Sequence, residues 1–105
     1  MSELENILHK QILLAGLPGP KREFLAIPGR RFRFDFYWPE SNLLVEVQGG
    51  VWTKGGHTSG IGMNRDAEKT NLAVLLGFRC LSVTSNQVKC GQALKWIQEA
   101  LGVAA

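Results

Sequence analysis

Two short β-type segments, Arg31–Tyr37 and Leu43–Gln48, place the tightest restriction on how this chain can fold. The first segment alternates apolar and polar residues, a pattern typical of a strand with one buried face. Its apolar positions are Phe32, Phe34 and Phe36, and its polar positions are Arg33, Asp35 and Tyr37. Because only residues 38–42 join the two segments, we predict an antiparallel hairpin.

Burial sets the register of this hairpin, since a slip of one residue would turn the phenylalanines toward water. The pairs that we expect are Phe34 with Val47, Phe36 with Val45, and Arg33 with Gln48. The same register places Asp35 opposite Glu46, with their Cβ atoms about 5 Å apart. Two facing carboxylates repel, so they need a compensating cation, which is either a basic side chain or a divalent metal. A register that differs by two residues would instead leave both acids in solvent.

The remaining pattern predicts one α/β domain over residues 1–105, a length that suits a single core. Helices are expected at Ser2–Ala15, at Arg65–Leu76 and from Ser85 to Gly102, and two further strands at Phe24–Ile27 and Phe78–Val83. Ser2 and Glu5 form a capping-box pair, and Asn64 and Ser85 are the expected N-caps of the later helices. The element order is therefore αβββαβα. A three-strand meander followed by a crossover helix implies a mixed sheet of about four strands flanked by helices.

Charge gives the first indication of a partner. The chain has 12 lysines and arginines against 9 acids. Its densest cationic stretch contains Lys21, Arg22, Arg30, Arg31 and Arg33. Such a cluster either contacts a polyanion, of which nucleic acid is the commonest, or forms a solvated basic face. No apolar run is long enough to cross a bilayer, and the first ten residues lack the pattern of a secretory signal. We therefore expect a cytoplasmic protein with no membrane partner.

A glycine-rich stretch without periodicity, Gly49–Gly62, follows the second strand of the hairpin. A loop of that length inside a small domain is usually functional or mobile. It contains Lys54 and His57, and the histidine could contact a phosphate or lie in solvent. No Gly-Lys-Ser/Thr sequence follows its glycines, so we expect no site for a nucleotide triphosphate.

Asp35, followed after ten residues by Glu46-Val47-Gln48, resembles the signature of the PD-(D/E)XK nuclease superfamily, an acid on one strand and acid–any–lysine on the next. The element order is similar to the core of that superfamily. The segment from His57 through Arg65, Asp66 and Lys69 to Gly77-Phe78 resembles its small members. These include very-short-patch repair endonucleases, virus-type replication–repair nucleases and Holliday-junction resolvases. The resemblance covers roughly Leu4 to Val83 and implies a restriction-endonuclease-like core.

The sequence departs from the signature at Gln48, which occupies the lysine position. A glutamine can orient a water molecule but cannot stabilise negative charge as an ammonium does. A lysine from elsewhere supplies that charge, or the enzyme works without it, or activity is lost. Lys69 is the best substitute because a helix beside the sheet could project it toward the acids, and Lys54 is the second.

The resemblance implies metal-assisted hydrolysis of DNA phosphodiester bonds. Asp35, Glu46 and the backbone carbonyl of Val47 would hold Mg²⁺ or Mn²⁺. Glu5 is the candidate for a further acid from the first helix, although its capping role explains it equally well. The residues expected to contact nucleic acid are Arg30, Arg31, Arg33, Lys54, His57, Arg65 and Lys69.

We expect an endonuclease that selects branched, nicked or junction DNA and acts as a homodimer, because the short chain has no room for a separate DNA-reading domain. Such an enzyme would fit DNA repair or recombination in a phage or mobile element. The alternative is a non-catalytic DNA-binding module whose nuclease site degenerated at Gln48. A weaker alternative is a small interaction domain whose basic cluster binds an acidic protein.

Overall fold

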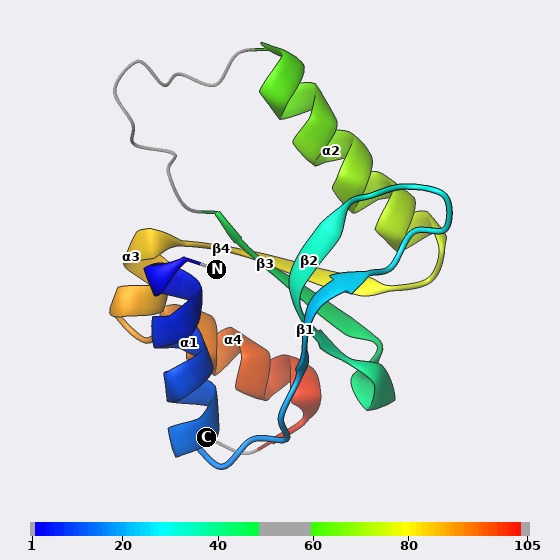
Figure 1. Ribbon diagram of the computed structural model, residues 1–105. Coiled ribbons are helices and arrows are strands. Elements are labelled where there is room, and N and C mark those ends of the chain that lie inside the picture. The colour runs from blue at the N-terminus through cyan, green and yellow to red at the C-terminus, as the bar shows by residue number, and fades with distance from the viewer. Residues whose placement is uncertain (1, 49–59, 104–105) are drawn as a thin grey trace.

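Four strands form one mixed sheet with helices on both of its faces (Figure 1). The computed structural model describes residues 2–48 and 60–103. Its elements are α1 (Glu3–Leu14), β1 (Lys21–Leu25), β2 (Arg33–Trp38), the short 3-10 helix η1 (Pro39–Ser41), β3 (Leu43–Gln48), α2 (Gly60–Leu75), β4 (Arg79–Thr84), α3 (Ser85–Lys89) and α4 (Gln92–Leu101). The α/β class and the mixed four-stranded sheet predicted from the sequence are confirmed. Within the described ranges, no helix is long and apolar enough to span a bilayer.

The strands lie in the order β1-β2-β3-β4. The first three form an antiparallel meander, and β4 runs parallel to β3. Helix α2 makes the crossover that a parallel neighbour requires. The predicted hairpin register is confirmed where β2 pairs with β3, because Phe36 lies opposite Val45. The register shifted by two residues is therefore excluded.

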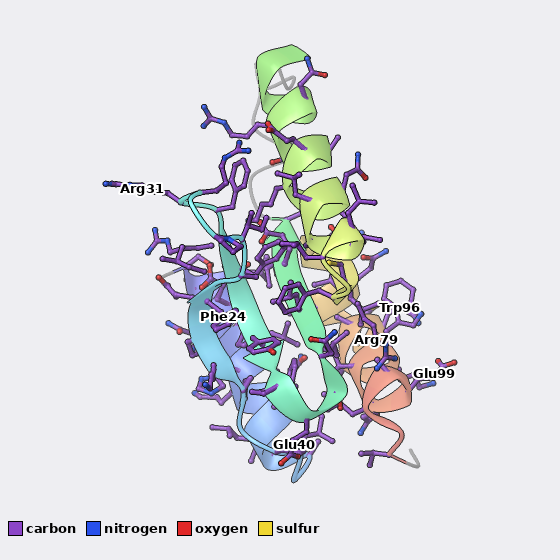
Figure 2. The ribbon with its side chains drawn as sticks, turned by 90° about the vertical axis from the view of Figure 1, so that its right-hand side faces the viewer. Phe24, Arg31, Glu40, Arg79, Trp96 and Glu99 are labelled. Atoms are coloured by element: carbon purple, nitrogen blue, oxygen red, sulfur yellow. The ribbon has the colours of Figure 1, made fainter. Side chains whose placement is uncertain are left out.

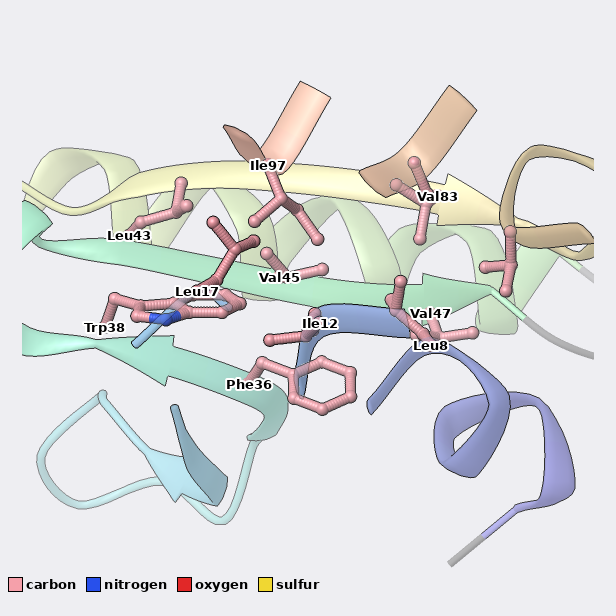
Figure 3. Packing of buried hydrophobic residues seen from close by; sticks show 12 residues of the cluster. Leu8, Ile12, Leu17, Phe36, Trp38, Leu43, Val45, Val47, Val83 and Ile97 are labelled. Carbon is pink, nitrogen blue, oxygen red and sulfur yellow. The ribbon is translucent and has the colours of Figure 1, made fainter. Parts of the chain in front are cut away.

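Two hydrophobic clusters fill the space on either side of the sheet. The larger one lies between the sheet and helices α1, α3 and α4 and contains Leu8, Ile12, Phe36, Trp38, Val45, Val83 and Ile97 (Figure 3). The smaller one lies under α2 and contains Ala26, Ile27, Phe34, Leu44 and Ala73. Alternation along β3 explains this division, since Val45 and Val47 face the larger cluster and Leu44 the smaller one.

The alternation expected along β2 is interrupted at Asp35, which corrects one prediction. Phe34 was expected to share a face with Phe36 and to lie beside Val47, but it packs in the cluster under α2. Asp35 has no partner in the β1–β2 pairs, which include both of its neighbours, Phe34 and Phe36. The β2–β3 pairs extend from Trp38 only to Phe36 and do not reach Asp35. Glu23, the β1 residue that would oppose Asp35, has a left-handed φ of 50°. A local irregularity of this kind re-aims side chains, as a β-bulge does.

Several element boundaries also differ from the prediction. Strand β1 begins at Lys21 rather than Phe24 and ends at Leu25 rather than Ile27. The apolar Ala26 and Ile27 are buried in the connection that follows the strand. Helix α2 begins at Gly60, so Asn64 lies inside it and is not its N-cap. The predicted last helix is two helices that break at Gly91, whose φ is 89°. Thr84 rather than Ser85 caps the first of them, in a capping box with Gln87.

The larger cluster is expected to dominate stability. Ile97 on α4 is 0% exposed and packs against the sheet, whereas Leu75 at the end of α2 is 82% exposed. Ile97→Ala removes buried methylene groups and leaves a cavity, so we expect it to cost about 2–5 kcal/mol. Leu75→Ala, the matched control, is expected to change stability by about 0.5 kcal/mol or less. Urea unfolding measures both, and equal losses would contradict the packing described above.

Candidate functional site

The candidate site lies where β2 and β3 stop pairing. Instead of a backbone pair at this point, the Oδ2 atom of Asp35 accepts a hydrogen bond of 2.7 Å from the backbone N–H of Val47. The carboxylate of Asp35 thus connects the two strands just beside Glu46. Both acids are only partly exposed, in contrast to the solvated state that the shifted register would have produced.

Helix α2 brings Lys69 to these acids. Its Nζ atom lies 2.7 Å from Oε1 of Glu46 and also donates a hydrogen bond to the backbone carbonyl of Arg33. The same ammonium lies 4.6 Å from the centroid of the Phe34 ring. The structure therefore brings together the two predicted acids and the lysine that was predicted as the best substitute for Gln48.

Glu5 lies next to this group. Its backbone N–H donates to the Oγ atom of the N-cap residue Ser2 at 3.1 Å, which confirms that Ser2 caps α1. Its carboxylate faces Asp35 and lies 3.6 Å from an Nη atom of Arg22. The Oε1 atom is buried and accepts no hydrogen bond from any residue that the structure describes. The backbone of Glu5 thus takes part in the N-terminal cap of α1, while its side chain is directed at the candidate site.

Burial and like charge perturb both predicted acids. Burial raises the pKa of Asp35 to about 7, and the charges of Glu46 and Glu5 act in the same direction, although the Val47 N–H partly opposes them. Burial also raises the pKa of Glu46, while Lys69 lowers it through its hydrogen bond and its charge. Carboxylates with raised pKa values are concentrated at functional sites, because burial and like charges there adjust the pKa to the chemistry that the group performs.

A cleft of about 450 Å³ opens beside these residues. Glu5, Asp35 and Lys69 line it, together with Arg31 from the β1–β2 connection, Arg33 from the start of β2 and Arg65 from α2. The carboxylates favour a cation, and the surrounding guanidinium groups favour a polyanion. Both kinds of ligand could therefore meet in one place.

The arginines around the cleft are not equivalent. Arg30 forms an ion pair of 2.9 Å with Glu68, and Arg33 forms one of 2.8 Å with Glu23. Arg31 projects from the β1–β2 connection away from the body of the protein (Figure 2). It has no ion-pair partner within residues 2–48 and 60–103. Arg31 is therefore the arginine of this stretch that is most available to an external anion.

Other predicted site residues lie elsewhere. The Nε2 atom of Gln48 donates a hydrogen bond of 3.0 Å to Oγ of Ser82 on β4, whereas Glu46 is paired with Lys69. Lys54 and His57 lie outside the described residues. Their predicted roles stay predictions.

Sequence reasoning missed the group behind Glu5. Arg22 was counted in the exposed cationic cluster, yet its side chain is only 19% exposed. Its Nη1 atom donates a hydrogen bond of 2.8 Å to Nδ1 of His9, and its guanidinium lies 4.7 Å from the centroid of the Phe36 ring. Burial and the charge of Arg22 lower the pKa of His9. The helix α1 packs against β1 here through residues distant in sequence, and no local pattern indicates such a contact.

The donor set fits a hard divalent cation. Asp35 and Glu46 supply carboxylate oxygens, and the Val47 carbonyl belongs to the residue whose N–H binds Asp35. The carboxylate of Glu5 lies nearby, but its Oε1 atom is already 3.6 Å from the Arg22 guanidinium and makes no hydrogen bond among the described residues. No group of three acidic, histidine or cysteine side chains in the described parts of the chain is already converged for a metal. Mg²⁺ commonly uses one or two carboxylates and retains several waters, so a converged cage is not required. Comparison of the chain with protein-family models, with curated proteins and with solved structures finds no match.

Proposed function

We propose that this protein is a divalent-metal-dependent nuclease with a restriction-endonuclease-like core that hydrolyses phosphodiester bonds of DNA. The observation that carries the proposal is the ion pair of 2.7 Å between Lys69 and Glu46, beside Asp35. The sequence resembles the PD-(D/E)XK signature except for its missing lysine, and α2 supplies an ammonium at the acids from another element. Two strand acids and one lysine beside a cleft that is also lined by arginines are what such a nuclease needs.

Each residue has a distinct role in the proposed reaction. Asp35, Glu46 and the Val47 carbonyl would hold Mg²⁺ or Mn²⁺, which when bound supplies an activated water and neutralises charge on the phosphate. The Val47 N–H orients the Asp35 carboxylate. Lys69 would stabilise the negative charge that develops on the phosphate oxygens. Arg31 and Arg65, which line the cleft, would bind neighbouring phosphates and so position the DNA strand.

Cleavage assays with Mg²⁺ or Mn²⁺ on junction, flap, single-stranded and duplex DNA test the proposal. We expect cleavage of at least one substrate, which a chelator stops. Glu46→Ala should be inactive, whereas Glu99→Ala, which removes an exposed acid on α4 (Figure 2), should cut like the wild type. Absence of cleavage on every substrate, or undiminished cleavage by Glu46→Ala, would refute a nuclease function.

The second candidate function is a DNA-binding module without catalysis. The hydrogen bond between Gln48 and Ser82 favours it, because the residue at the lysine position of the signature is held by β4 and brings no charge. This function predicts salt-dependent DNA binding, no cleavage, and no thermal stabilisation by a divalent metal. Stabilisation by Mn²⁺ that disappears in Glu46→Gln would decide against it.

The finer features of the proposal concern substrate and assembly. The arginines that line the cleft would contact phosphates, which carry no base sequence, so we propose selectivity for the shape of branched, nicked or junction DNA in repair or recombination. Cutting both strands at one place needs two sites, so we propose a homodimer. Light scattering during size-exclusion chromatography, with and without junction DNA, measures the assembly.

Arg31 and Arg30 should contribute unequally to DNA binding. Arg31 has no ion-pair partner among the described residues, while Arg30 is bound to Glu68 and its guanidinium lies 4.5 Å from the centroid of the Phe32 ring. We expect Arg31→Met to flatten the slope of log Kd against log salt by about one unit, and Arg30→Met to change it less. Fluorescence anisotropy at several salt concentrations measures the slopes. An equal change in both variants would contradict the inequality.

A further inference from the structure

The ammonium of Lys69 lies in a binding site formed by three groups of the protein. Three groups surround it, namely the Glu46 carboxylate at 2.7 Å, the backbone carbonyl of Arg33, and the face of the Phe34 ring with its centroid at 4.6 Å. A carboxylate, a carbonyl dipole and an aromatic face all attract a cation. The side chain of Lys69 is only 13% exposed, so it is held in place rather than free in solvent.

Lys69 also lies between Glu46 and the cleft. The described residues that line the cleft include Asp35 and Lys69 but not Glu46. A cation that enters through the cleft therefore reaches Asp35 directly and meets the Lys69 ammonium before it reaches Glu46. The ammonium contacts only the Oε1 atom of Glu46, but a divalent cation on either oxygen of this small carboxylate would lie close to the ammonium, and the two positive charges would repel each other strongly.

We propose that Lys69 is an exchangeable counter-ion of Glu46, and that a divalent cation binds to Glu46 only when the ammonium of Lys69 leaves it. This inference rests on the proposed function, because it assumes that Asp35 and Glu46 hold a metal. It adds that metal binding determines where the ammonium of Lys69 lies. Without metal the ammonium neutralises Glu46, and with metal it is released toward the cleft, where a phosphate would lie.

Arg65 separates this exchange from a general effect of charge. It is also on α2 and also lines the cleft, but it is exposed and forms no ion pair with Glu46. Removing Arg65 takes away one positive charge near the metal without uncovering Glu46. Removing Lys69 does both.

The test measures binding of Mn²⁺ alone, without DNA, by isothermal titration calorimetry at pH 8. We expect Lys69→Met to bind Mn²⁺ at least about tenfold more tightly than the wild type, because the competing state is no longer populated. Lys69→Gln is a second neutral variant, whose amide can still donate to the Arg33 carbonyl if Lys69→Met does not fold. Arg65→Met should gain much less affinity than either, since an exposed charge is screened by salt.

The outcomes separate the two levels of the proposal. If the wild type binds Mn²⁺ and both Lys69 variants bind it equally or more weakly, the exchange is refuted and the nuclease proposal stands. A gain in Arg65→Met as large as in Lys69→Met also refutes the exchange, because charge alone then explains the gain. If neither the wild type nor any variant binds Mn²⁺, the metal site itself is refuted, and the exchange with it.

Discussion

Asp35→Asn is expected to raise the thermal stability of the metal-free protein at pH 8 while it eliminates metal-dependent DNA cleavage. Burial and the neighbouring carboxylates raise the pKa of Asp35 to about 7, so the ionised side chain destabilises the folded state. An asparagine has nearly the same shape, carries no charge, and can still accept the hydrogen bond from the Val47 N–H through its Oδ1 atom. Stability should therefore increase as the function is lost.

The sign of the pH dependence follows from the direction of this shift. A carboxyl group whose pKa is higher in the folded state binds its proton more tightly there, so protonation favours folding. As pH rises from the unfolded value of 3.8 through the folded value of about 7, this group's stabilising contribution is lost. Above that range the penalty is constant. Asp35→Asn lacks the penalty, so its advantage over the wild type should grow between about pH 4 and 7 and then level off.

The size of the effect is limited by the partial exposure of Asp35. With a discount for solvent screening, we expect a gain of about 1–3 kcal/mol at pH 8, or a rise in Tm of several degrees. Thermal unfolding in a chelating buffer at pH 4, 6 and 8 measures it. Glu99→Gln, which removes the charge of an exposed acid on α4 that does not line the cleft, is the control and should leave the Tm unchanged.

The loss of cleavage in Asp35→Asn should be about 10³-fold or more, since a metal contributes several kcal/mol to such a reaction. A lower Tm for Asp35→Asn at pH 8, or a gain in stability that does not depend on pH, would contradict the electrostatic account. A variant that is both more stable and still active would show that Asp35 does not belong to the catalytic site.

The hairpin was predictable because its information is local. Alternation in Arg31–Tyr37 and the short connection to Leu43–Gln48 determine which strands pair and in which register, and the pair of Phe36 with Val45 confirms that register. The same register brings Asp35 next to Glu46. The cap of the first helix at Ser2 was likewise predictable from residues close in sequence.

The contacts that complete the site were not readable, because they join elements through packing. The sequence places Lys69 on a helix, but only the crossover of α2 over the β1–β2 connection fixes its ammonium against Glu46 and the Arg33 carbonyl. The change of face at Asp35, which sends Phe34 under α2, depends on both neighbouring strands. The regular alternation of apolar and polar residues in Arg31–Tyr37 does not indicate this change of face.

Lys69→Met is expected to reduce cleavage by about 10²- to 10³-fold, because it removes the only ammonium that contacts the acids among the described residues. The reduction should appear in kcat, since a phosphate oxygen gains charge only as the reaction proceeds. Gln48→Lys alone should not raise activity. It would place a second ammonium on the same face of β3 as Glu46, where the first already neutralises that carboxylate.

The combination of the two substitutions gives the sharper test. Gln48 lies two residues after Glu46 on β3, about 7 Å along the strand, and the long side chain of a lysine covers that distance. Gln48→Lys with Lys69→Met should therefore regain at least about tenfold of the lost kcat, because the charge returns from the strand instead of the helix. Steady-state kinetics at saturating Mn²⁺ measures the three variants. If the kcat of Lys69→Met is within about threefold of the wild-type value, the ion pair with Glu46 serves stability alone, since a catalytic ammonium supplies far more than that. If Lys69→Met is inactive and the combined variant gains no activity, the ammonium must act from the position that α2 gives it.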